Sequence, residues 1–125
     1  RGSPGAGADL QEILVHRETM IHDLISLPQA IADAEARAVD REIARRAAEE
    51  NLKDREMDVL LTSGRLDGKN EVIRAAQLRE LTSDGRRILA AREADLAGAR
   101  VALHLQQNRF SAAKALARLL ASGGD

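Results

Sequence analysis

The chain has no cysteine, tryptophan or tyrosine, and Phe110 is its one aromatic residue. The lack of cysteine excludes disulfide bonds, thiol catalysis and thiolate zinc sites, and it suits a reducing cytoplasm, where we expect the protein to act. Proline occurs twice, and no apolar run approaches the roughly 20 residues that a helix needs to cross a bilayer. We therefore expect no membrane-spanning segment.

The residues that are present favour helix. Of 125 residues, 44% are hydrophobic, many of them alanine, and 31% are charged, with a net charge of −1. Alanine is a strong helix former that buries little side-chain area. A pair of such helices would have a thin core, so we expect further helices or a partner chain to complete it.

Charge is unevenly distributed along the chain. Residues 1–27 carry two basic and four acidic groups. Residues 28–63 carry six basic and nine acidic groups, and residues 64–122 carry eleven basic and six acidic groups. The net charges are therefore −2, −3 and +5. Opposite charges of this kind predict that the acidic and basic segments attract each other within the fold, with an external anion site as the alternative.

Helical spacing and breakers predict four helices, over residues 9–26, 28–63, 71–81 and 84–121. Asp9 is expected to cap the first helix, and Pro28 is expected to interrupt it, with Ser26 capping the next one. Gly64 supplies a C-terminal stop, residues 64–70 a turn, and residues 82–85 a second break. We treat residues 1–8 as a flexible lead or a remnant of expression, 9–122 as a single all-helical domain, and 123–125 as a flexible tail.

The final predicted helix is apolar on two sides. A seven-residue repeat, typical of helices that pack lengthwise, comprises Leu89, Leu96, Leu103 and Phe110. The other side carries Val101, Leu105, Ala112, Leu116 and Leu119. A helix with two apolar sides needs two neighbours, and residues 110–120 are expected to lie deepest. The predicted fold is all-α: a coiled-coil-like antiparallel hairpin of long helices with additional shorter helices, completed by oligomerisation.

No catalytic, cofactor or metal site is predicted. Residues 64–70 lack the spacing and the hydroxyl of a phosphate-binding loop, because three residues separate Gly64 from Gly68-Lys69 and Asn70 follows. The histidines His16, His22 and His104 show no zinc-binding pattern. Dense carboxylates in residues 49–58 are typical of solvated ladders with neighbouring arginines and lysines. We therefore expect a protein that is not an enzyme.

The last helix carries the strongest polar pattern. No acidic residue occurs in 96–124, and one stripe follows alternating spacings of four and three through Arg100, His104, Gln107, Ser111, Lys114 and Arg118. Arg109 adds a further cation on another face. Three interpretations stay open: contact with a partner protein or subunit, simple solvated charge, and contact with nucleic acid through Arg100, Arg109, Lys114 and Arg118.

Residues 64–121 resemble a group of small helical proteins encoded by phages and prophages. The resemblance is carried by the segment 66–74, Leu-Asp-Gly-Lys-Asn-Glu-Val-Ile-Arg, by Gln77-Leu78 and by Asn108-Arg109-Phe110. It implies a phage-derived protein associated with replication or recombination, and singles out Gly68, Lys69, Asn70, Arg74 and Gln77. The chain departs from that pattern in having fewer acids in its last helix. Physically, Asn70 is expected to cap, with Arg74 and Gln77 stabilising the turn.

The leading functional hypothesis is a non-enzymatic helical assembly or adaptor protein, expected to be a homodimer. The residues predicted to carry its packing and interface contacts are Leu89, Leu96, Leu103, Phe110, Leu116 and Leu120. The alternative is a nucleic-acid accessory factor of phage replication or recombination. An enzyme would require a pocket assembled across subunits.

Overall fold

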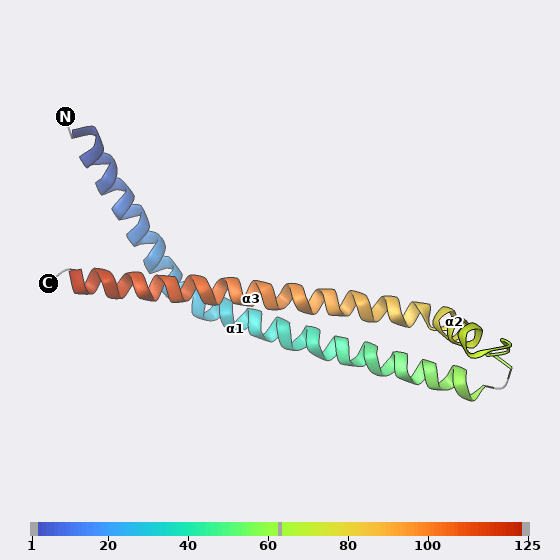
Figure 1. Ribbon diagram of the computed structural model, residues 1–125. Helices are drawn as coiled ribbons and strands as arrows, with labels where there is room; N and C mark the ends of the chain where they lie inside the picture. Colours follow the sequence, from blue (N-terminus) through green and yellow to red (C-terminus); the bar gives the residue numbers. More distant parts are fainter. Residues whose placement is uncertain (1–2, 63, 124–125) are drawn as a thin grey trace. The chain divides into compact units, whose positions relative to one another are not determined.

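The computed structural model describes residues 3–62 and 64–123, and within these ranges it contains three helices and no strand. Helix α1 spans Ser3–Leu61, α2 spans Glu71–Leu81 and α3 spans Ser83–Gly123 (Figure 1). The predicted all-α class is confirmed, and the two long helices α1 and α3 pack against each other. None of the helices in the described ranges is apolar over enough residues to cross a membrane.

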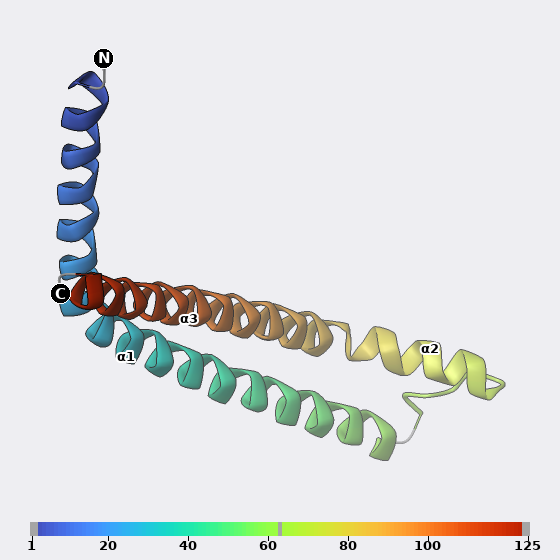
Figure 2. The same ribbon diagram turned by 60° about the vertical axis from the view of Figure 1, so that its left-hand side comes forward.

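The predicted break at Pro28 is wrong, because α1 continues through this residue. Proline in a helix interior removes one hydrogen bond and crowds the preceding turn, which bends the helix without ending it. In Figures 1 and 2, α1 is drawn as one helix from its dark-blue start to its green end. Ser26 does not cap a new helix: its Oγ donates a hydrogen bond to the His22 carbonyl at 2.8 Å, one turn back.

Helix α1 begins before its predicted start and ends two residues before its predicted end, whereas α3 extends past both of its predicted bounds. Helix α1 begins at Ser3, so Asp9 is not its N-cap and residues 3–8 are helical instead of a lead outside the fold. Helix α3 extends from Ser83 to Gly123, two residues past the expected end. The rest of the expected tail, residues 124–125, lies outside the described residues.

The connection between α1 and α2 follows its local sequence signals. Gly64 has φ of 85°, the left-handed conformation that glycine adopts at least cost. Asn70 precedes α2, and its Oδ1 accepts a hydrogen bond from the Ile73 amide at 2.9 Å. The predicted bounds of α2 and the predicted cap are both confirmed.

A single residue, Thr82, separates α2 from α3. Its side chain is fully buried, and its Oγ1 donates to the Leu78 carbonyl at 2.8 Å while accepting from Arg86 Nε at 3.1 Å. The predicted break at residues 82–85 is thus reduced to one hydrogen-bonded residue.

Contacts divide the chain into two compact units, each built from both long helices. Unit 1 comprises Arg1–Glu35 and Val101–Asp125, and unit 2 comprises Ala36–Arg100. The sequence treats residues 9–122 as one domain, whereas the contacts separate the two ends of that stretch from its middle.

In unit 2 the two long helices are antiparallel. Arg86 Nη2 lies 3.5 Å from Glu56 Oε1, and Arg100 Nη2 lies 3.8 Å from Glu42 Oε2. The two ion pairs are fourteen residues apart on each helix. From one pair to the other, the residue numbers decrease along α1 and increase along α3. This step equals two heptads, the spacing at which the same helix face returns to the contact. The buried apolar residues of this unit are Ala48, Leu52, Val59 and Leu96.

Unit 1 holds fewer buried side chains. Its buried apolar residues are Leu27, Ala34 and Ala113, and Asp23 is the buried charged residue. Arg109 Nη2 donates to Asp23 Oδ1 at 2.7 Å, which joins α1 to α3 across 86 residues of sequence. The expectation that residues 110–120 lie deepest is wrong, since among them only Ala113 is buried and Leu119 is 69% exposed.

Candidate interaction surfaces

The seven-residue stripe of α3 lies toward the interior of the fold. Leu96 is 4% exposed, and Leu89, Leu103 and Phe110 are half-buried. These four residues, predicted as packing residues, are therefore used within the chain. The other two predicted interface residues, Leu116 and Leu120, are 37% and 46% exposed and are left for a contact from outside.

The second apolar stripe of α3 is not covered, contrary to the prediction that both sides are packed. Its large members Val101, Leu105, Leu116 and Leu119 are exposed. The same holds more widely: twenty large apolar side chains of the described residues are exposed, and only Leu27, Leu52, Val59 and Leu96 are buried. Exposed apolar residues are common on proteins when scattered singly, whereas a continuous stripe marks a contact site.

Four of the exposed apolar side chains of unit 1 border a groove of about 910 Å³. The α1 side contributes Ile13, His16, Arg17, Met20 and Ile21, and the α3 side contributes Leu116, Leu120 and Ala121. Two of its eight lining residues carry a charged or titratable group. The sequence placed Ile13 and Ile21 on one helix face, but it could not place that face opposite Leu116 and Leu120.

The four cations predicted to contact anions are not equally available. Arg100 pairs with Glu42 and Arg109 pairs with Asp23. Lys114 Nζ lies 4.7 Å from the centroid of the Phe110 ring, an attractive cation–π contact. Arg118 forms no ion pair in the described part of the chain. Two of the four charges are thus neutralised inside the units, in line with the expected attraction between acidic and basic segments.

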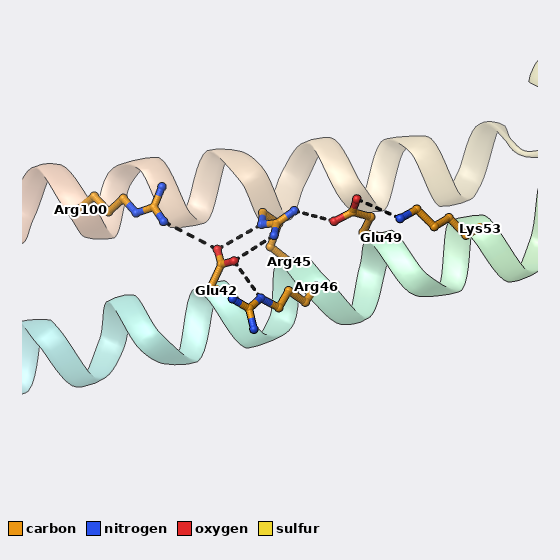
Figure 3. A network of polar contacts seen from close by, with 6 residues as sticks. All are labelled: Glu42, Arg45, Arg46, Glu49, Lys53 and Arg100. Atoms are coloured by element: carbon orange, nitrogen blue, oxygen red, sulfur yellow. Dashed lines mark hydrogen bonds and ion pairs between the residues drawn. The ribbon is translucent and has the colours of Figure 1, made fainter.

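A network of charged side chains in unit 2 surrounds Glu42 (Figure 3). Glu42 accepts from Arg45 Nη2 at 2.9 Å, from Arg45 Nε at 3.1 Å and from Arg46 Nε at 3.1 Å. Arg45 also donates to Glu49, which lies 3.4 Å from Lys53 Nζ. The sequence predicts solvated ladders for such groups, and the observed spacings of three and four residues agree with that prediction.

The network changes the acid–base properties of its members. Hydrogen bonds from Arg45, followed by those from Arg46, lower the pKa of Glu42 from 4.5 to about 2 against the opposing effect of burial. Hydrogen bonds from Arg45 and Lys53 also lower the pKa of Glu49, and those carboxylates raise the pKa of Arg45. All three groups are thereby held in their charged forms, which suits a structural role and not proton transfer.

Stability should depend on pH through Glu42. Because its pKa is lower in the folded chain than the ordinary 4.5, ionised Glu42 favours the fold above pH 4.5, and this contribution is lost as pH falls toward 2. We expect Glu42→Gln to lower the melting temperature by a few degrees at pH 7, with the difference shrinking to nothing near pH 2. Circular dichroism melts from pH 2 to 7 test this.

Glu93→Gln is the matched control, since Glu93 lies beside Glu42 and Arg45 but forms no ion pair in the described ranges. A difference between wild type and Glu42→Gln that stays constant down to pH 2 would contradict the assigned role of Glu42.

The turn singled out by the resemblance is a hydrogen-bonded structure before α2. Gln77 Oε1 accepts from the Gly68 amide at 3.0 Å, and Gln77 Nε2 donates to Asp67 Oδ1 at 2.6 Å. Arg74 Nη1 donates to the Gly68 carbonyl at 3.0 Å. The contacts agree with the physical interpretation, in which Asn70 caps and Arg74 and Gln77 hold the turn, while Lys69 is exposed.

Gly68 has no room for a side chain. A Cβ there would lie 2.5 Å from Ile73 Cγ2 and 3.0 Å from Gln77 Oε1, so Gly68→Ala should destabilise the chain by about 1–3 kcal/mol. Gly98→Ala is the control, because a Cβ at Gly98 of α3 meets nothing within 4 Å and should stabilise by about 0.5–1 kcal/mol. Urea unfolding of both variants checks this pair, and equal effects would contradict the close packing at Gly68.

Groups that could hold a metal are dispersed. Across residues 3–62 and 64–123, no three histidine or carboxylate side chains gather closely enough to bind a metal ion. His16, His22 and His104 are all exposed, and His16 borders the groove of unit 1.

Comparisons with known proteins do not identify a function, so the proposed function depends on the contacts described above. No protein-family model, no curated protein and no solved structure matches the chain.

Proposed function

We propose that this protein is a non-enzymatic helical assembly protein that associates through the apolar faces of α1 and α3. The observation that supports this most is the imbalance between twenty exposed and four buried large apolar side chains in the described residues. Burying a Leu or Ile side chain yields about 1.5–3 kcal/mol, so covering even part of this surface would stabilise an assembly substantially.

A second copy of the chain is the partner we propose, acting in the cytoplasm. Homodimers are the commonest assemblies of soluble proteins, and the charges of this chain are self-complementary by segment, with −5 over residues 1–63 and +5 over 64–122. Leu116 and Leu120 are the predicted interface residues that are available for this contact. The resemblance to phage-encoded helical proteins is compatible with such a role.

Light scattering and sedimentation over a wide concentration range test the proposal. We expect a mass of two chains at micromolar concentration, falling toward one on dilution, and a helical content that rises with association. A single-chain mass at every concentration, with full helicity and sharp thermal unfolding, would contradict self-assembly.

A nucleic-acid accessory factor is the second candidate, and the absence of acidic residues in 96–124 favours it. Of the four cations in this segment, Lys114 and Arg118 are the two that form no ion pair in the part of the chain that the structure describes. If nucleic acid binds here, affinity should fall steeply with salt and drop when both are changed to glutamine. Arg87→Gln is the control on the same helix. No fluorescence anisotropy change with DNA or RNA at low salt would exclude this candidate.

A further inference from the structure

The groove of unit 1 has the form of a helix-docking site, and its own chain supplies a helix of matching chemistry. Its wall is apolar on both sides, with Ile13 and Ile21 from α1 facing Leu116 and Leu120 from α3. An amphipathic helix laid in such a groove would bury these residues in the way that helical bundles bury their core.

Residues 9–25 of α1 form a helix of this kind. At about 100° per residue, Leu10, Ile13, Leu14, Ile21 and Ile25 fall on one apolar stripe about 120° wide, and all five are exposed. Ile13 and Ile21 border the groove of their own chain, whereas Leu10, Leu14 and Ile25 do not. The stripe is thus wide enough to contact two neighbours, of which the chain supplies one.

Charge identifies the second neighbour. Residues 9–25 carry four acidic groups against Arg17, a net charge of −3, and residues 101–123 carry Arg109, Lys114 and Arg118 with no acid, a net charge of +3. Among the described residues of unit 1, only Asp23 and Arg109 form an ion pair, and none joins Glu12 or Glu18 to Lys114 or Arg118. Because the α3 segment beside the groove is basic, it attracts a helix with the negative charge of residues 9–25.

We propose that two copies of the chain pair reciprocally, so that residues 9–25 of each copy line the groove of their own chain and also dock into the groove of the other copy. The result is a four-helix bundle made from two α1 segments and two α3 segments, related by a two-fold axis. This inference rests on the self-assembly proposed above and specifies the surface that carries it.

Cysteine cross-linking tests the arrangement, because the natural chain contains no cysteine and each introduced thiol is therefore unique. A Leu14→Cys chain is mixed with a longer, tagged Leu116→Cys chain and oxidised. We expect a covalent heterodimer as the main product, at least ten times more abundant than the product from Val39→Cys mixed with Leu116→Cys. Val39 is equally exposed but belongs to unit 2.

Charge reversal gives an independent readout in the full chain. Glu12→Lys with Glu18→Lys should weaken self-association at least tenfold, and adding Lys114→Glu with Arg118→Glu should restore it. Light scattering separates the possible failures. A dimer that forms no 14–116 cross-link, and ignores charge reversal, overturns this arrangement and leaves self-assembly standing, whereas a monomer at all concentrations overturns both. A cross-link within one Leu14→Cys/Leu116→Cys chain would show that the groove closes on its own α1 and would also overturn the reciprocal docking.

Discussion

Replacing Val59 with aspartate should abolish cooperative folding of unit 2. Val59 is fully buried on α1, and aspartate there would either bury a carboxylate without a partner or open the helix contact to water. Either outcome costs several kcal/mol, comparable with the whole stability of a small protein, about 5–15 kcal/mol. We expect low helicity at 25 °C and loss of the sharp thermal transition in circular dichroism.

Val72→Asp is the matched control, because it makes the same exchange at a position that is 80% exposed. Val72 lies in the first turn of α2, where a negative charge interacts favourably with the helix dipole. Its stability should change by less than about 0.5 kcal/mol. If Val59→Asp melted as sharply as Val72→Asp and at the same temperature, the contact between α1 and α3 in unit 2 would be contradicted.

Local signals predicted the middle of the chain well. The bounds of α2, its Asn70 cap and the stop at Gly64 all follow from side chains that interact within a few residues, and such interactions can be found by spacing alone. The inward position of Leu96 followed from the seven-residue repeat in the same way. The pattern reports which face of a helix is apolar, and one such face was buried as expected.

The predictions from sequence were wrong where the structure depends on interactions between segments that are distant in the chain. Whether Pro28 ends or bends a helix depends on the residues on both sides of it, and α1 continues through it. Leu105 and Leu119 share a stripe as regular as that of Leu96, yet they are 60% and 69% exposed in the described part of the chain. Periodicity shows which faces of a helix are apolar, but it does not show how many neighbouring helices are available to cover them. The groove residue Met20 was missed because no pattern marked it.

The contact between Asp23 and Arg109 was also invisible in the sequence, although the charges of the segments pointed toward it. It should account for much of the stability of unit 1. The Asp23 side chain is 12% exposed, and Arg109 Nη2 lies 2.7 Å from its Oδ1. Arg109→Met would leave a nearly buried carboxylate without its partner, while keeping much of the apolar stem.

We expect Arg109→Met to cost about 1–3 kcal/mol in urea unfolding, toward the lower end because the arginine side chain is itself 59% exposed. The double variant Asp23→Leu with Arg109→Met should recover most of that loss, since removing both partners leaves no buried charge unpaired. Lys114→Met on the same helix is the control and should cost less than about 1 kcal/mol, because its contact with the Phe110 ring is exposed.

A double variant no more stable than Arg109→Met would show that the cost does not come from an orphaned Asp23. The same series separates the two proposed functions. Arg109 was one of four candidate nucleic-acid contacts, but a cation held on Asp23 is partly neutralised before any phosphate arrives. If Arg109→Met weakened nucleic-acid binding and the stable double variant restored it, the loss would belong to folding. Persistent loss in the double variant would return Arg109 to the binding surface.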